Sequence, residues 1–166
     1  TNEMHSEKFI PLSILTSAFI IGGCIYLGLM NSPAKPLKND NVKVVTFNSK
    51  DGVKLSGFFI KRTNSMGNLL LCHGYQSCKE SMIDYIDMFP DYNILLFDFR
   101  AHGQSDGKFR TLGCHEYKDV IAASEFLKEQ TKIPGASFNN FPQIILGFSM
   151  GGACAMAAEG YEPTIC

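Results

Sequence analysis

The sequence predicts an α/β fold in which an N-terminal antiparallel hairpin is followed by a mostly parallel sheet. After the hairpin, segments typical of strands alternate with segments of helical spacing, as the crossover connections of a parallel sheet require. The three later strand segments are apolar without interruption, which is typical of strands buried on both faces. Glycine-containing polar segments follow each of them, where an open α/β sheet carries its chemistry.

The hairpin is predicted by two runs of strand-forming residues and by the turn between them. Val42–Asn48 and Val53–Ile60 are rich in Val, Phe and Ile, which favour strands. The segment 49–52 between them ends in Asp51-Gly52, a pair that suits the tight turn of a hairpin.

Short apolar runs predict the parallel strands at Asn68–Cys72, Asn93–Phe97 and Pro142–Leu146. Helices are predicted between and after these strands, at Lys79–Phe89, Glu116–Gln130 and Gly152–Ala158. In the first helix, the spacing places four apolar side chains on one face: Met82, Ile83, Ile86 and Phe89.

The segment from Phe9 to Met30 differs from the rest of the chain because it contains no Asp, Glu, Lys, Arg or His. As a helix it spans roughly 33 Å, enough to cross the hydrocarbon layer of a bilayer. We therefore expect residues 9–30 to form a transmembrane helix. The alternatives are a cleaved signal peptide, whose apolar region is usually shorter, a buried core helix, and a lipoprotein cleavage site at residues 21–24.

The expected domain organisation is a tail at residues 1–8, the transmembrane helix, a linker at residues 31–41 and a folded domain at residues 42–166. Lys8 is the one lysine or arginine before the apolar segment, whereas three lysines follow it closely: Lys35, Lys38 and Lys43. The positive-inside rule then predicts a single-pass membrane protein whose folded domain faces the cytoplasm.

Composition argues against several classes of function. The net charge is −1 and the basic residues are scattered, so no nucleic acid is expected as a partner. The six cysteines form no C-x-x-C pair and no zinc-like spacing with histidine, so no metal site is expected, and no cofactor is expected either. Cys72 and Cys154 are interpreted as small buried apolar residues.

The most informative motif is Gly147-Phe148-Ser149-Met150-Gly151, which lies between the last predicted strand and the last predicted helix. A strand, a Gly-x-Ser-x-Gly turn and a helix together form a nucleophile elbow, in which a sharp turn exposes the serine hydroxyl. A glycine-rich turn without chemistry is the alternative when the pentapeptide is considered alone.

Two further segments follow the first and second parallel strands, His73–Ser77 and Asp98–Gly107. Together with the elbow, in this order and spacing, they resemble the N-terminal half of an α/β-hydrolase. The resemblance is closest to membrane-anchored bacterial serine hydrolases of the serine-aminopeptidase-like and dienelactone-hydrolase-like groups, and it covers about residues 42–160. It implies a partial α/β-hydrolase domain that is truncated after the elbow helix.

The resemblance implies roles for the elbow residues. Ser149 would be the nucleophile, and the backbone N–H groups of Tyr75 and Met150 would form the oxyanion hole. Gly147 and Gly151 would be the elbow glycines, whose missing side chains make room for the turn. A structural turn serine and a pocket-lining tyrosine are the alternatives for Ser149 and Tyr75.

The resemblance also implies structural roles for the residues of the other two loops. His73 and His102 would be structural residues rather than catalytic bases. Asp98 and Arg100 would hold the second loop in shape through hydrogen bonds. Asp119 is expected to be solvated on its helix.

The implied function is a serine hydrolase that acts on a carboxylic ester, thioester or small amide through an acyl-enzyme at Ser149. The triad acid and histidine of this family follow later strands, which this chain does not contain. We therefore expect the chain alone to be inactive and the elbow strand to lie at a sheet edge. The expected partners are a small-molecule acyl substrate and the membrane. The alternative is a non-catalytic membrane-tethered remnant or binding module.

Overall fold

The computed structural model describes residues 42–134 and 141–161. The predicted tail, transmembrane helix at residues 9–30 and linker lie outside these ranges. No helix within the described ranges has the length and apolar character needed to cross a bilayer.

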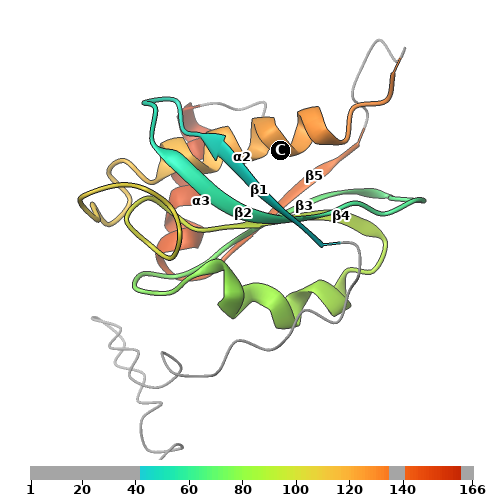
Figure 1. Ribbon diagram of the computed structural model, residues 1–166, viewed down its shortest axis with the longest axis horizontal. Helices are drawn as coiled ribbons and strands as arrows, with labels where there is room; N and C mark the ends of the chain where they lie inside the picture. The colour runs from blue at the N-terminus through green and yellow to red at the C-terminus, as the bar shows by residue number, and fades with distance from the viewer. Residues whose placement is uncertain (1–41, 135–140, 162–166) are drawn as a thin grey trace, which may run out of the picture. The chain divides into compact units, whose positions relative to one another are not determined.

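The described residues form a five-stranded mixed sheet with helices on both faces (Figure 1). The elements in chain order are β1 (Val42–Asn48), β2 (Lys54–Ile60), β3 (Gly67–Cys72), the 3₁₀ helix η1 (Lys79–Met88), β4 (Tyr92–Phe97), α2 (Tyr117–Gln130), β5 (Gln143–Gly147) and α3 (Met150–Tyr161). The order across the sheet is β1-β2-β4-β3-β5. β1, β2 and β4 pair antiparallel, whereas β3 pairs parallel with both β4 and β5. The predicted hairpin and parallel strands are therefore confirmed, with small differences in their bounds.

Two predicted helices differ in detail from the observed ones. The segment predicted as a helix at Lys79–Phe89 forms a 3₁₀ helix, although Met82 and Ile86 still face the core. The helix predicted to begin at Gly152 begins at Met150, so Gly151 lies in its first turn. The elbow motif and the helix therefore overlap in sequence.

The core consists of two apolar clusters, one on each face of the sheet. Alternate residues along β3 and β4 point to opposite faces, so each strand contributes to both clusters. One cluster packs under α2 and α3, and the other packs under η1, which Figure 1 shows in green on the opposite face. All six residues of β3 are buried, as expected for a central strand covered on both faces.

A partly buried network of charges joins the hairpin to α2. Arg100, which follows β4, donates to both carboxylate oxygens of Asp119 on α2 and to both carboxylate oxygens of Asp51 in the hairpin turn, at 2.7–3.1 Å. The expectation that Asp119 is solvated is wrong, because this residue is fully buried. Its burial is possible because Arg100 supplies the opposite charge and four hydrogen bonds, one of them from its backbone N–H.

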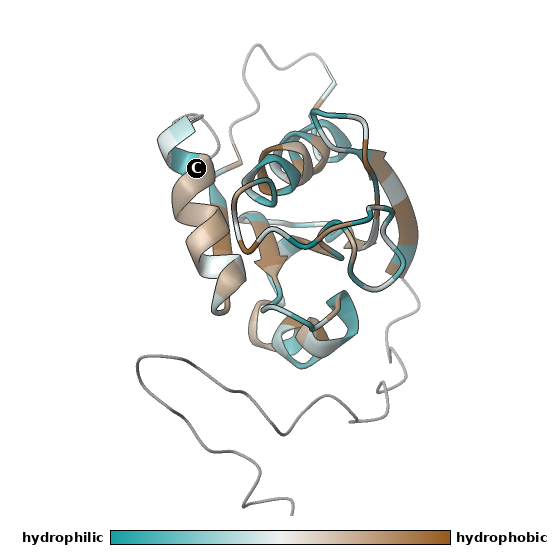
Figure 2. Cartoon of the chain, turned by 90° about the vertical axis from the view of Figure 1, so that its left-hand side faces the viewer, coloured by the Kyte–Doolittle hydropathy of each residue, from teal (hydrophilic) through white to brown (hydrophobic). Residues whose placement is uncertain are grey.

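β5 lies at one edge of the sheet, as predicted for the strand that leads to the elbow. It pairs with β3 on one side, and no strand of the described residues pairs with its other side. Apolar side chains are exposed here, with Ile144 at 43% and Met156 of α3 at 75% exposure. Figure 2 shows the apolar colouring along most of α3. Among the described residues, this edge of the sheet therefore combines unpaired strand backbone with exposed apolar side chains.

Candidate active site

The turn between β5 and α3 holds Ser149 in an unusual backbone conformation. β5 ends at Gly147 and α3 begins at Met150, so Phe148 and Ser149 make the whole connection. Ser149 has a φ of 50°, in the left-handed region that L-residues other than glycine seldom adopt. Its side chain is exposed. The geometry is that of a sharp, strained turn that presents a hydroxyl at the carboxyl end of a parallel strand.

Close backbone contacts explain why glycine flanks this turn on both sides. A Cβ atom on Gly147 would lie 2.5 Å from the backbone nitrogen of Gly152. A Cβ atom on Gly151 would lie 2.5 Å from the carbonyl oxygen of Cys72 and 2.6 Å from that of His73. The first turn of α3 therefore packs directly against the end of β3, and only glycine fits there.

The same packing brings the loop after β3 beside the elbow. The N–H of Phe148 donates to the carbonyl oxygen of Cys72 at 3.0 Å. A Cβ atom built on Gly74 would lie 3.6 Å from the Cβ atom of Ser149, so Tyr75 follows a residue that lies beside the serine. Met150 is the first residue of α3, where backbone N–H groups have no acceptor within the helix. The structure therefore brings Ser149, Tyr75 and Met150 to one place, and the oxyanion-hole role of the two N–H groups stays a prediction.

His73 and His102 connect the two loops next to the elbow through their Nε2 atoms, and each also uses Nδ1 for a hydrogen bond within its own loop. Nε2 of His73 accepts the N–H of Phe99 at 3.1 Å, so Nδ1 carries the proton and donates to the carbonyl oxygen of Gly74 at 2.7 Å. Nε2 of His102 accepts the N–H of Gln76 at 3.3 Å. Its Nδ1 donates to the carbonyl oxygen of Arg100 at 2.8 Å.

Both imidazoles are therefore held neutral. Burial lowers the pKa of His73 to about 4, and burial also lowers the pKa of His102. Their Nε2 atoms already accept backbone protons and have no lone pair left for a reacting hydroxyl. These contacts agree with the expectation that both histidines are structural.

A buried ion pair that was not predicted from the sequence fixes the loop after β4, residues 98–107. The ammonium group of Lys79, at the start of η1, donates to Asp98 at 2.6 Å, and both residues are fully buried. Burial opposes the charge on Lys79, but the hydrogen bond and charge of Asp98 outweigh it and raise the pKa of Lys79. Lys79 precedes Met82 by three residues and Ile86 by seven, so helical spacing places it on the same buried face. This spacing could have predicted the burial of Lys79.

The carboxylate of Asp98 also organises the backbone around it. It accepts the N–H of Lys79 at 2.7 Å and the N–H of Gln104 at 2.9 Å. Gly103 has a φ of 49°, and a Cβ atom there would collide with this carboxylate. Asp98 and Arg100 thus both hold the loop in shape through hydrogen bonds, as the resemblance implied.

Two cysteines near the elbow are small buried residues rather than reactive groups. Cys72 and Cys154 are buried, as predicted, and burial raises the pKa of both thiols, that of Cys154 to about 12. Within the two described ranges, no three His, Cys, Asp or Glu side chains are grouped so that they could hold a metal ion.

The fold and the elbow geometry agree with a comparison of the sequence with known families. The sequence pattern of the alpha/beta hydrolase fold matches residues 67–165, which is more than half of the chain. The chain belongs to the alpha/beta hydrolase fold family. The matched range begins at β3 and contains the two loops, the elbow and α3.

Individual members of the alpha/beta hydrolase fold family give the same result. The esterase Pf2001 of Pyrococcus furiosus is similar in structure, with a TM-score of 0.66 and 32% identity over 82% of this chain and 52% of its own. The alpha/beta hydrolase GrgF from Penicillium sp. sh18 has a TM-score of 0.62 at 22% identity, covering 74% of this chain and 42% of its own, which shows the fold alone.

Among curated proteins, the uncharacterized protein YqkD of Bacillus subtilis is 24% identical over 172 aligned positions. The match covers 91% of this chain and 54% of YqkD. The chain thus spans about half the length of the curated relatives that it matches.

Alanine substitutions of two glycines in α3 test the packing of the elbow. Gly151→Ala is expected to lower the free energy of unfolding by about 2–3 kcal/mol, because its methyl group meets backbone carbonyl oxygens that cannot move aside. Gly160→Ala, in the same helix, has open space around it and is expected to raise stability by about 0.5 kcal/mol. Urea denaturation of both variants measures the difference, and equal effects would contradict the close contact.

The neutral histidines predict how stability depends on pH. The folded pKa of His73 is about 4 and its ordinary value is 6.5, so between these values the unfolded chain binds more protons than the folded one. The stability contributed by neutral His73 is therefore present above pH 6.5 and is lost as the pH falls toward 4. Its contribution approaches about 1.4 kcal/mol per pH unit within this window.

The matched variants for this test are His73→Gln and His115→Gln. Urea denaturation between pH 4.5 and 6.5 is expected to give a shallower pH slope for His73→Gln, since glutamine takes up no proton. His115 is exposed, and its variant controls for the replacement of a histidine outside the buried loops. A parent chain whose stability does not change across this window would contradict the assignment of a neutral, buried His73.

Proposed function

We propose that this chain supplies the nucleophilic half of a serine hydrolase, with Ser149 as the nucleophile. The observation that supports this proposal is the strained φ of 50° at Ser149, in a two-residue connection between a parallel strand and a helix. Strain of this kind costs about 1–2 kcal/mol and persists at functional positions where the surrounding structure enforces it. A purely structural connection has no need to expose a hydroxyl in this way.

In the proposed reaction, the Oγ atom of Ser149 attacks the carbonyl carbon of an acyl substrate. The negative charge that develops on the carbonyl oxygen is stabilised by the N–H groups of Tyr75, which follows Gly74 beside the serine, and of Met150, the first residue of α3. The leaving group departs to give an acyl-enzyme, and water then releases the acid. The positive end of α3 adds to the stabilisation of negative charge at the same place.

The reaction needs a general base, and the two loop histidines do not supply it. His73 and His102 each use Nε2 to accept a backbone N–H. The proposal therefore assigns the base and its carboxylate to residues outside ranges 42–134 and 141–161. The proposed substrate is a carboxylic ester, thioester or small amide, and the similarity to the Pyrococcus furiosus esterase favours the ester. Anchoring through residues 9–30 and a cytoplasmic location of the domain are proposed with it.

The second candidate function is that of a membrane-tethered binding module without catalysis. The observation that favours it is that both loop histidines use their two ring nitrogens in hydrogen bonds to backbone groups. Neither histidine is therefore free to activate Ser149. In this case the exposed edge at β5 and α3 would be the functional surface rather than the elbow.

Labelling with a fluorophosphonate separates the two candidates. The protein expressed from its complete gene is expected to be labelled on Ser149, because the reagent reacts with an activated serine. Ser149→Ala should abolish labelling, and Ser81→Ala, at an exposed serine of η1, should retain it. The 166-residue chain alone is expected to show negligible ester turnover, since a serine enzyme without its base and acid loses several orders of magnitude in rate.

Two results would contradict the hydrolase proposal. One is labelling that survives in Ser149→Ala, which would place the reactive group elsewhere. The other is a folded protein of native length that the reagent does not label, which would favour the binding module.

A further inference from the structure

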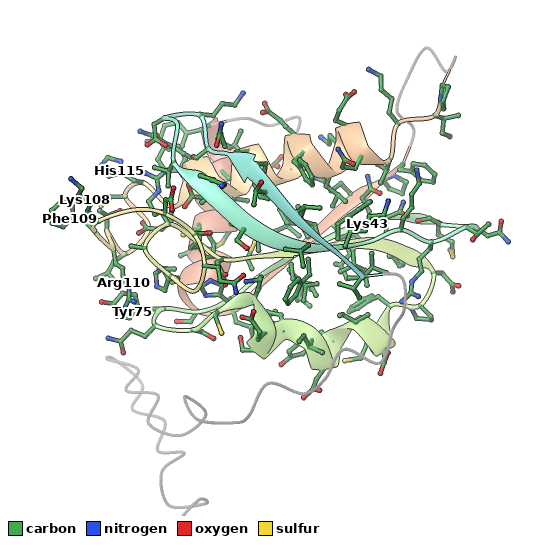
Figure 3. The ribbon with its side chains drawn as sticks, in the orientation of Figure 1. Lys43, Tyr75, Lys108, Phe109, Arg110 and His115 are labelled. Atoms are coloured by element: carbon green, nitrogen blue, oxygen red, sulfur yellow. The ribbon has the colours of Figure 1, made fainter. Side chains whose placement is uncertain are left out.

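A loop beside the elbow exposes large apolar side chains that belong to neither cluster of the core. In the loop before α2, Phe109 is 76% exposed and Leu112 is 67% exposed. Tyr75, from the loop after β3, is 41% exposed. Figure 3 shows Tyr75, Lys108, Phe109, Arg110 and His115 along the same side of the domain. Isolated exposed apolar residues are ordinary, but three within neighbouring loops indicate a surface with a partner.

Short, partly buried hydrogen bonds hold this loop in its exposed conformation. The carboxylate of Glu116, which is fully buried, accepts the N–H groups of Thr111 and Gly113, each at 2.7 Å, and the hydroxyl of Thr111 at the same distance. Leu112 lies between these anchors with a φ of 52°, a left-handed conformation that is unfavourable for leucine. The loop is therefore built to keep the leucine side chain outside, since no packing of that side chain compensates for the backbone conformation.

The tip of this loop, residues 107–115, carries two positive charges. Residues 107–115 contain Lys108 and Arg110 and no Asp or Glu, in a chain whose net charge is −1. Among the described residues, neither cation forms an ion pair with a carboxylate. Nε of Arg110 donates to the carbonyl oxygen of Ala101 at 2.9 Å, and its guanidinium group lies 6.0 Å from the ring centre of Tyr75. The hydrogen bond to Ala101 thus positions the guanidinium group of Arg110, and no carboxylate of the described residues neutralises its charge.

We propose that residues 108–112, together with Tyr75, dock on a bilayer surface that contains anionic phospholipid. Aromatic and leucine side chains at a loop tip enter the boundary between headgroups and acyl chains, and flanking cations bind the lipid phosphates. A small anionic ligand fits the surface less well, because Lys108, Phe109 and Arg110 are all exposed to solvent. Docking in this way turns the edge that carries Ser149 toward the membrane. The inference does not depend on whether Ser149 is catalytic.

The absence of tryptophan from the sequence makes a direct test possible. Phe109→Trp places a single tryptophan at the proposed contact, in the full chain. Vesicles of phosphatidylcholine with phosphatidylglycerol are expected to shift its emission to shorter wavelength, and brominated lipid is expected to quench it. The matched control is Val44→Trp, at a residue of β1 that is 70% exposed, whose emission should not respond. Because the signal comes from one position, attachment of another part of the chain to the vesicles does not produce it.

Charge variants in the Phe109→Trp chain test the role of the cations. Replacing both Lys108 and Arg110 by glutamine is expected to weaken the vesicle-dependent signal by about 30-fold, since each cation near an anionic surface contributes a factor of about five. Lys108→Gln alone, which removes no hydrogen bond of the loop, is expected to weaken it about fivefold. Lys43→Gln, at an exposed lysine of β1, should leave it unchanged.

Three outcomes would overturn the proposal. The first is a tryptophan at position 109 that does not respond to anionic vesicles. The second is an equal response to phosphatidylcholine alone, which would remove the role of the anionic lipid. The third is an emission that is already shifted and protected without lipid, which would show that another part of the protein or a protein partner covers the loop.

Discussion

The backbone contact between α3 and the end of β3 is the constraint on which the rest of this structure depends. A side chain at Gly151 would strike the carbonyl oxygens of Cys72 and His73, so the helix approaches the strand as closely as two backbones can. That approach leaves two residues to connect β5 with α3 and drives Ser149 into a left-handed conformation. It also brings Gly74 beside the serine. The exposed hydroxyl is therefore a consequence of how the helix packs.

A second set of interactions makes this edge of the sheet rigid. His73 and His102 connect the loops after β3 and β4. The loop after β4 is also held by the Lys79–Asp98 ion pair and by the hydrogen bonds of Arg100 to Asp119. Buried ion pairs contribute little net stability compared with apolar packing, because the desolvation of their charges offsets much of the gain. They do specify one arrangement of the loops. The stable core lies beneath them, and the polar groups set the geometry at the carboxyl ends of the strands.

Most of the fold was predicted from the sequence, because the strands and helices follow from apolar runs, helical spacing and turn residues that are close together in the chain. Continuous apolar runs predicted β3, β4 and β5, and the Asp-Gly turn predicted the hairpin, in agreement with the structure. The burial of Asp119 and Lys79 was not predicted, because their partners are 19 residues away in sequence and become neighbours only when the sheet forms. Helical spacing alone also could not distinguish η1 from an α-helix, since Met82 and Ile86 face the core in either form. The elbow was found from sequence because its close contacts require glycine at fixed positions.

A crystal structure of the chain that defines the backbone at Ser149 tests this account most directly. The account predicts a φ near +50° at Ser149, with the Cα atom of Gly151 against the carbonyl oxygens of Cys72 and His73. A serine with an ordinary helical φ, or an α3 that stands away from β3 with room for a side chain at position 151, would contradict it.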